Sequence, residues 1–127
     1  MERFLWICVG GAFGSGARYL LSGWVQESLG AQFPWGTLAV NVVGSFLIAL
    51  VMQLAISTGQ VSPLLRMTLT TGVIGGFTTY SAFNYETFAL MQQRAWLLAS
   101  ANVAATLVLC MLAGYLGQAS AKWMASG

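Results

Sequence analysis

Apolar residues dominate four long stretches of the chain, and most charged residues and both prolines lie at or between the ends of these stretches. A helix needs about 20 residues to cross the hydrocarbon core of a bilayer, and each stretch has roughly that length or more. We therefore expect four transmembrane helices, spanning about residues 4–27, 35–56, 63–91 and 95–123. The five tryptophans fall near the expected span ends, where amphipathic rings settle at the headgroups.

The third expected span contains residues that a helix interior disfavours. Gly75 and Gly76 adjoin near its middle, and Thr78 and Thr79 follow directly. A glycine costs about 1 kcal/mol relative to alanine in a helix, and threonine is stiff at its first side-chain torsion. We expect the helix to be broken there, with the freed backbone groups lining a cavity or binding an ion. A mere kink, or a glycine face for close helix packing, explains the same pattern equally well.

Polar side chains inside the spans are arranged in rows. In the second span Thr37, Asn41 and Ser45 follow one another at i+4 spacing, and Asn102 and Thr106 have the same spacing in the fourth. Small and polar residues are the ordinary contacts of membrane bundles, which is the more conservative interpretation of a single serine or threonine. Asn41 lies at mid-span, however, where an amide needs water or a partner, so we favour a functional role for it.

Arg18 interrupts the first span, and a guanidinium in lipid costs about 2.5 kcal/mol or more. The chain has no histidine, and its carboxylates, Glu2, Glu27 and Glu86, lie at span ends. A proton relay or a cation site built from acids at mid-membrane therefore has no material. The groups that remain are donors, namely hydroxyls, amides and Arg18, and they favour a small anion as the solute.

Composition fixes the class of protein. Of the 127 residues, 57% are hydrophobic and only 6% are charged, which is typical of a membrane protein with a single domain, residues 1–127, in contact with lipid. The net charge of +2 includes no basic run that could follow a phosphate backbone, so we expect no nucleic-acid partner. No catalytic triad, zinc motif or phosphate-binding loop is present, so we do not expect an enzyme.

The few charges also bear on orientation and assembly. With four spans, Arg3, Arg66 and Lys122 fall on one side of the membrane and Arg94 on the other, a weak bias. A chain this evenly balanced can insert both ways, and two opposite copies can then form an antiparallel dual-topology homodimer. A bundle this small encloses little volume, which also favours a second copy.

Three segments resemble those of a known family. They are "GGAFGSGARY" from Gly10 to Tyr19, "GTLAVNVVGSF" from Gly36 to Phe46 and "GGFTTYSAF" from Gly75 to Phe83. Together they are similar to the Fluc (CrcB) fluoride channels, and the resemblance extends over all four spans. It implies a passive, fluoride-selective channel of the bacterial inner membrane, an antiparallel homodimer with two pores and a structural sodium ion at its centre.

The resemblance also implies roles for individual residues. The main-chain carbonyls of Gly75 and Thr78 would hold the sodium ion, and Arg18 would make an aqueous vestibule electropositive. The implied fluoride pathway comprises Asn41, Tyr80, Phe83, Thr37, Ser81 and Glu86. Neutral donors along such a path suit rapid passage, because a fixed charge at every site would bind the ion too tightly.

One residue departs from the family pattern. Phenylalanine is usual at the position of Tyr80, and the tyrosine adds a hydroxyl that needs a partner in a tight pathway. Two other functions stay open on the sequence. A small dual-topology multidrug or cation exporter would need a carboxylate in the first span, where this chain has Arg18. A non-transporting assembly subunit would explain the glycine packing but not Asn41 together with a broken third helix.

Overall fold

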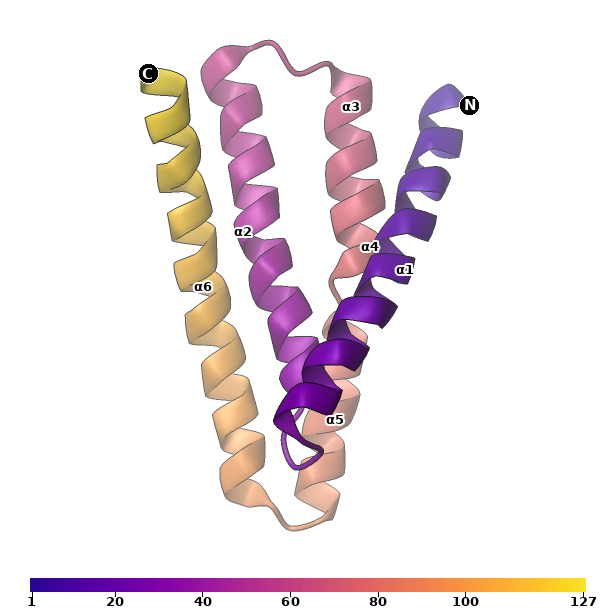
Figure 1. Cartoon of the computed structure of the whole chain (residues 1–127), viewed down its shortest axis with the longest axis vertical. Coiled ribbons are helices and arrows are strands. Elements are labelled where there is room, and N and C mark those ends of the chain that lie inside the picture. Colours follow the sequence, from indigo (N-terminus) through magenta and orange to yellow (C-terminus); the bar gives the residue numbers. More distant parts are fainter.

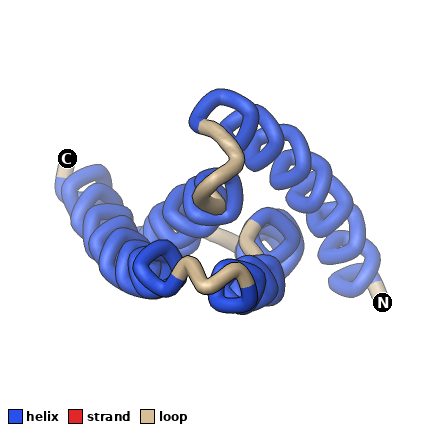
Figure 2. Tube along the Cα trace, turned by 90° about the horizontal axis from the view of Figure 1, so that it is seen from below, coloured by secondary structure: helices blue, strands red, loops and turns tan.

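The computed structural model describes all residues from 1 to 127, and every regular element in it is a helix. The chain has three long helices, α1 (Glu2–Leu29), α2 (Trp35–Thr58) and α6 (Trp96–Ser126) (Figure 1). Between α2 and α6 it forms one further helical segment, the third along the chain, which is made of shorter pieces. That segment consists of α3 (Pro63–Met67), a π-helix η1 (Thr68–Ile74), α4 (Gly75–Phe77) and α5 (Tyr80–Gln92). Viewed end-on, only helices and their connecting loops are seen (Figure 2).

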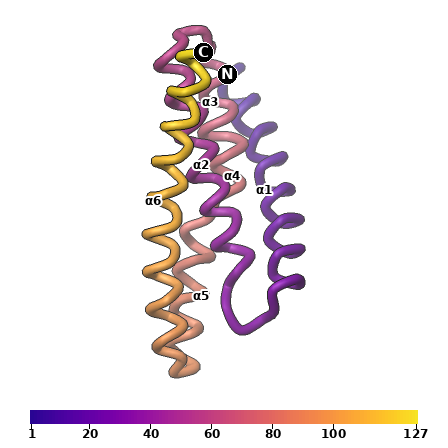
Figure 3. The backbone as a smooth tube through the Cα atoms, turned by 60° about the vertical axis from the view of Figure 1, so that its left-hand side comes forward, coloured from indigo at the N-terminus to yellow at the C-terminus, as the bar shows by residue number.

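Successive helical segments run along the bundle in alternating directions (Figure 1). α1, α2 and α6 are each long and apolar enough to span a membrane. The pieces from α3 to α5 follow one another end to end along the bundle, so the chain has four helical segments and both termini lie at one end (Figure 1). α2 and the third segment lie between α1 and α6, which do not contact each other (Figure 3). The protein is thus a multi-pass helical membrane protein.

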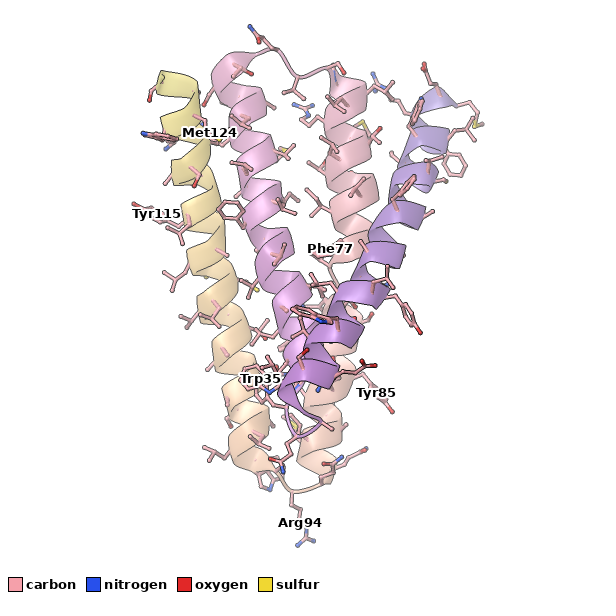
Figure 4. The ribbon with its side chains drawn as sticks, in the orientation of Figure 1. Trp35, Phe77, Tyr85, Arg94, Tyr115 and Met124 are labelled. Atoms are coloured by element: carbon pink, nitrogen blue, oxygen red, sulfur yellow. The ribbon has the colours of Figure 1, made fainter.

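Local sequence explains where several helices begin and end. Pro63 occupies the first turn of α3, and the Ser62 hydroxyl before it accepts a hydrogen bond from the N–H of Leu65. After α2, Gly59 has a left-handed backbone with φ of 65°, a conformation that glycine adopts without steric cost. Arg94, in the turn before α6, is the one non-glycine residue with positive φ, and its side chain points away from the bundle at the end opposite the termini (Figure 4).

Close packing in the bundle depends on small residues. α1 packs against η1 and α4, and α2 packs along α6. Gly14 lies so near the backbone of Val73 that no side chain fits between them, and Gly117 of α6 has the same relation to the Phe46 carbonyl of α2. Since lipid tails are as apolar as a leucine, contacts of this kind rather than hydrophobic exclusion hold membrane helices together.

The outer surface is apolar almost everywhere. Only 18 of the 127 residues are buried within the single chain. Large side chains such as Tyr85 and Tyr115 point away from the helices, whereas Phe77 lies among them (Figure 4). An apolar exterior of this extent suits contact with lipid or with further copies of the chain.

Candidate ion pathway at the interruption of the third segment

The third segment loses its helical backbone for two residues. α4 ends at Phe77, Thr78 and Thr79 are extended with ψ of 162° and 113°, and α5 begins at Tyr80. Gly75, by contrast, has helical dihedrals of −60° and −39°. The sequence predicts a break at the paired glycines and the threonines together, whereas the backbone is non-helical at the two threonines alone. Gly76 packs directly on the Gly11 backbone of α1, which leaves no room for a side chain and favours an uninterrupted helix at this position.

Asn41 of α2 holds the interrupted backbone. Its Oδ1 accepts a hydrogen bond from the N–H of Thr79 at 2.8 Å, and its Nδ2 donates to the Thr79 carbonyl at 3.0 Å. Asn41 is buried, with 9% of its surface exposed. Two backbone groups that would be orphaned in a membrane interior are thereby satisfied by a single side chain.

Two more side chains form hydrogen bonds with backbone groups at the interruption. The Arg18 Nε of α1 donates to the Gly76 carbonyl at 3.0 Å. The Thr79 hydroxyl accepts from the N–H of Ala82 at 3.1 Å and so caps α5. Arg18 therefore lies at the interruption, and its contact there is with a backbone carbonyl.

These hydrogen bonds also divert the N–H groups that would have paired with two carbonyls. In a continuous helix the N–H of Thr79 would bond the Gly75 carbonyl, and that of Ala82 would bond the Thr78 carbonyl. The first donates to Asn41 instead, and the second to the Thr79 hydroxyl. The two carbonyls predicted as cation ligands are therefore those whose helical partners are engaged elsewhere, and Gly75 lies on the exposed side of the chain.

A cavity of about 360 Å³ adjoins the interruption between α2, α5 and α6. Asn41, Thr78, Tyr80 and Phe83 are among its 13 lining residues, none of which is charged. Thr106 on α6 also lines this cavity, and its buried hydroxyl has no hydrogen-bond partner in the chain. The cavity therefore offers neutral polar groups beside aromatic rings.

The two aromatic residues of this cavity form a pair. The ring centroids of Tyr80 and Phe83 are 5.6 Å apart, with the planes at 60°, an edge-to-face arrangement. Phe83 is half-buried, whereas Tyr80 is 77% exposed in the single chain. Ring edges carry partial positive charge, so the pair can present weak donors to an anion.

A second pocket, of about 600 Å³, lies toward the end of the bundle near the α1–α2 loop. Glu86 lines it, and the Thr37 hydroxyl donates to Glu86 Oε1 at 2.6 Å. Gln26 also lines this pocket, and its amide bonds three backbone groups of the loop and of the start of α2, those of Gly30, Phe33 and Gly36.

The sequence-derived candidates thus fall into groups. Asn41, Tyr80 and Phe83 share one cavity, and Thr37 and Glu86 form a hydrogen-bonded pair beside another. Ser81 is exposed and lines neither pocket; its hydroxyl lies 3.3 Å from that of Thr79.

Two residues near the pathway were not selected from the sequence. Thr106 belongs to the polar row of the fourth expected span, and that row is the available signal for it. Gln26 had no signal, because its partners are backbone groups that any sequence supplies.

Comparison with known proteins gives a consistent answer. A family model described as "CrcB-like protein, Camphor Resistance (CrcB)" matches residues 5–118. A Sorangium cellulosum protein named "Fluoride-specific ion channel FluC" is 54% identical over 127 residues, covering all of both chains. Proteins of the same name from Anaeromyxobacter sp. (strain K) and Geobacter sulfurreducens are 50% and 49% identical, over 98% and 96% of this chain and 99% and 98% of theirs.

Proposed function

The chain belongs to the CrcB family, an ion-channel rather than an enzyme family, and we propose that it forms a passive fluoride-selective channel that exports fluoride across the bacterial inner membrane. The observation that carries the proposal is the uncharged cavity at the interruption, where one Asn41 N–H is still free and the ring edges of Tyr80 and Phe83 are close by. Relatives named as fluoride channels over their whole length support the choice of ion.

The proposed fluoride path leads from this cavity to the Glu86 pocket. Asn41, Phe83 and the Thr37–Glu86 pair come from the facing helices α2 and α5. Fluoride is strongly hydrated, so neutral donors at several steps must replace its water without holding it. Thr106 lines the same cavity, and its buried, unpartnered hydroxyl would become one more such donor if the side chain turned toward the cavity. Ser81 enters the path only if a second copy closes around its exposed hydroxyl.

An antiparallel homodimer with two pores is part of this proposal. Gly75, Tyr80, Ser81 and Asn84 are exposed in the single chain, and Asn84 makes no hydrogen bond within it. Polar side chains at membrane depth are costly against lipid, so a second copy is the better cover. The sparse charges, with Arg94 at the end opposite the termini, are compatible with insertion in both orientations.

The carbonyls of Gly75 and Thr78 fit a structural sodium ion at the centre of that dimer. Hard cations take oxygen ligands, and these two carbonyls have lost their helical donors to Asn41 and Thr79. Two copies would contribute two carbonyls each. Bound sodium would supply a fixed positive charge that joins the subunits, while Arg18 and Asn41 hold the backbone that presents the carbonyls.

Fluoride efflux from proteoliposomes, recorded with a fluoride electrode, tests the proposed function. We expect passive, electrogenic release of fluoride but not chloride, and a slower release for Thr37→Val, which removes the bond to Glu86 and keeps the side chain's shape. Such a hydrogen bond contributes about 1 kcal/mol net, which corresponds to about a fivefold change in an equilibrium constant, and we expect the release rate to fall by about that factor. Proton-coupled release of organic cations would instead indicate an exporter. No release from a well-folded preparation would indicate a non-transporting subunit.

A further inference from the structure

Asn41 contacts both the backbone of the proposed cation site and the cavity of the proposed anion path. Its amide holds the Thr79 backbone on one side, and it lines the 360 Å³ cavity of the proposed anion path on the other. An Nδ2 group carries two N–H donors, and only one is used by the Thr79 carbonyl. The same side chain can therefore donate to an anion while it clamps the interruption.

The two hydrogen bonds between the Asn41 amide and the Thr79 backbone, called the clamp below, determine whether the Gly75 carbonyl is free. Because Asn41 Oδ1 takes the N–H of Thr79, the Gly75 carbonyl loses the donor that would occupy it in a continuous helix. Without the amide, the N–H of Thr79 would have to find another acceptor at membrane depth, and the carbonyl of Gly75 is its natural helical partner. Losing the clamp would then turn a cation ligand into a helix acceptor.

We propose that Asn41 is a positioning residue for the cation site as well as a donor in the anion path, so that fluoride and sodium each raise the other's affinity. This inference rests on the proposed function. The reciprocity is required by thermodynamic linkage once one side chain contributes to both sites. The sign follows because an anion and a cation on two sides of one ordered amide attract each other, and because each ion orders the same clamp.

The test is a sodium titration of the purified full chain in detergent. Sodium-22 binding and the thermal unfolding temperature are the two quantities measured at each sodium concentration. In the wild type we expect fluoride to lower the sodium concentration for half-saturation, and chloride at equal concentration to leave it unchanged. Asn41→Leu keeps the volume and removes both hydrogen bonds. It should weaken sodium binding by about tenfold or more, as loss of an outer-shell partner does at metal sites, and abolish the fluoride effect.

Asn102→Leu is the matched control. Asn102 is also a buried amide, 2% exposed, but it donates to the Thr87 hydroxyl and makes no contact with the interruption. We expect it to keep the wild-type sodium affinity and the fluoride effect, whatever it costs in stability.

The outcomes separate this inference from the proposed function. Unchanged sodium affinity in Asn41→Leu, or a wild-type titration that fluoride does not shift, overturns the coupling and leaves the channel intact. A wild type that releases fluoride but binds no sodium overturns the cation site and the coupling together. Should Asn41→Leu fail to fold, the wild-type comparison of fluoride with chloride still decides.

Discussion

Polar backbone groups in a membrane must be hydrogen-bonded within the protein, and two regions of this chain meet that need in opposite ways. One region is the contact between α2 and α6, and the other is the interruption at Thr78 and Thr79. Along α2 and α6 the helices satisfy their own backbone, and no hydrogen bond joins the two helices. Their association depends on shape, with Gly117 against the Phe46 carbonyl. At the interruption the backbone is released, and side chains from two other helices, Arg18 and Asn41, satisfy it.

This difference shows where polar chemistry can be placed in so small a bundle. A packed interface of regular helices offers an ion nothing, because every carbonyl and N–H is already paired. An interruption offers free carbonyls and exposed donors, but only while neighbouring side chains hold it open. The first region should therefore tolerate the loss of polar groups and fail on added volume, and the second should behave in the opposite way.

The largest expected effect comes from added volume between α2 and α6. In Gly117→Ala the new methyl group would meet the Phe46 carbonyl, and it would lie 3.1 Å from the Ala49 methyl, so the helices must separate. Overpacking of this kind costs about 1–3 kcal/mol. Gly114→Ala, one turn earlier on the same helix, is the control, because its nearest neighbour, the Ser45 carbonyl oxygen, is 3.9 Å away. Thermal unfolding in detergent should separate the two variants, and equal stabilities would contradict the packing account.

A smaller effect is expected from two matched helix caps. Thr79→Val removes the hydroxyl that caps α5 at the interruption, and Ser62→Ala removes the one that caps α3 near the bundle end. Each loss costs about 1 kcal/mol of stability. Fluoride efflux should fall in Thr79→Val alone, because only that cap holds the backbone beside the proposed path. An equal fall in Ser62→Ala would show that flux merely follows stability.

Much of the fold could be predicted from the sequence, because membrane spans are a local property. The apolar stretches indicate an all-helical chain with four segments, and the helical structure agrees. The exact place of the interruption could not be predicted, because intrinsic propensity points to Gly75 and Gly76 as much as to Thr78 and Thr79. Gly76 serves close packing against α1, so tertiary contact overrides propensity there.

The candidate site was predictable by residue type but not by partner. A mid-span amide needs a partner, and this made Asn41 a candidate from the sequence alone. That partner is the backbone of a residue 38 positions away, which no local pattern reveals. The π-helical turn from Thr68 to Ile74 was likewise not predicted, since such turns arise from how a helix packs and have no sequence signature in this chain.

The smallest expected effect concerns the tyrosine hydroxyl at the interruption. Tyr80 is 77% exposed and its hydroxyl makes no hydrogen bond in the chain, so Tyr80→Phe should change stability by less than about 0.5 kcal/mol. The ring pair with Phe83 is kept, and removing a polar group from a tight path should raise fluoride efflux modestly. Tyr85→Phe, on the same helix, 75% exposed and outside the cavity, is the control. Initial efflux rates from proteoliposomes compare the two, and identical rates for Tyr80→Phe and the wild type would remove the hydroxyl from the pathway.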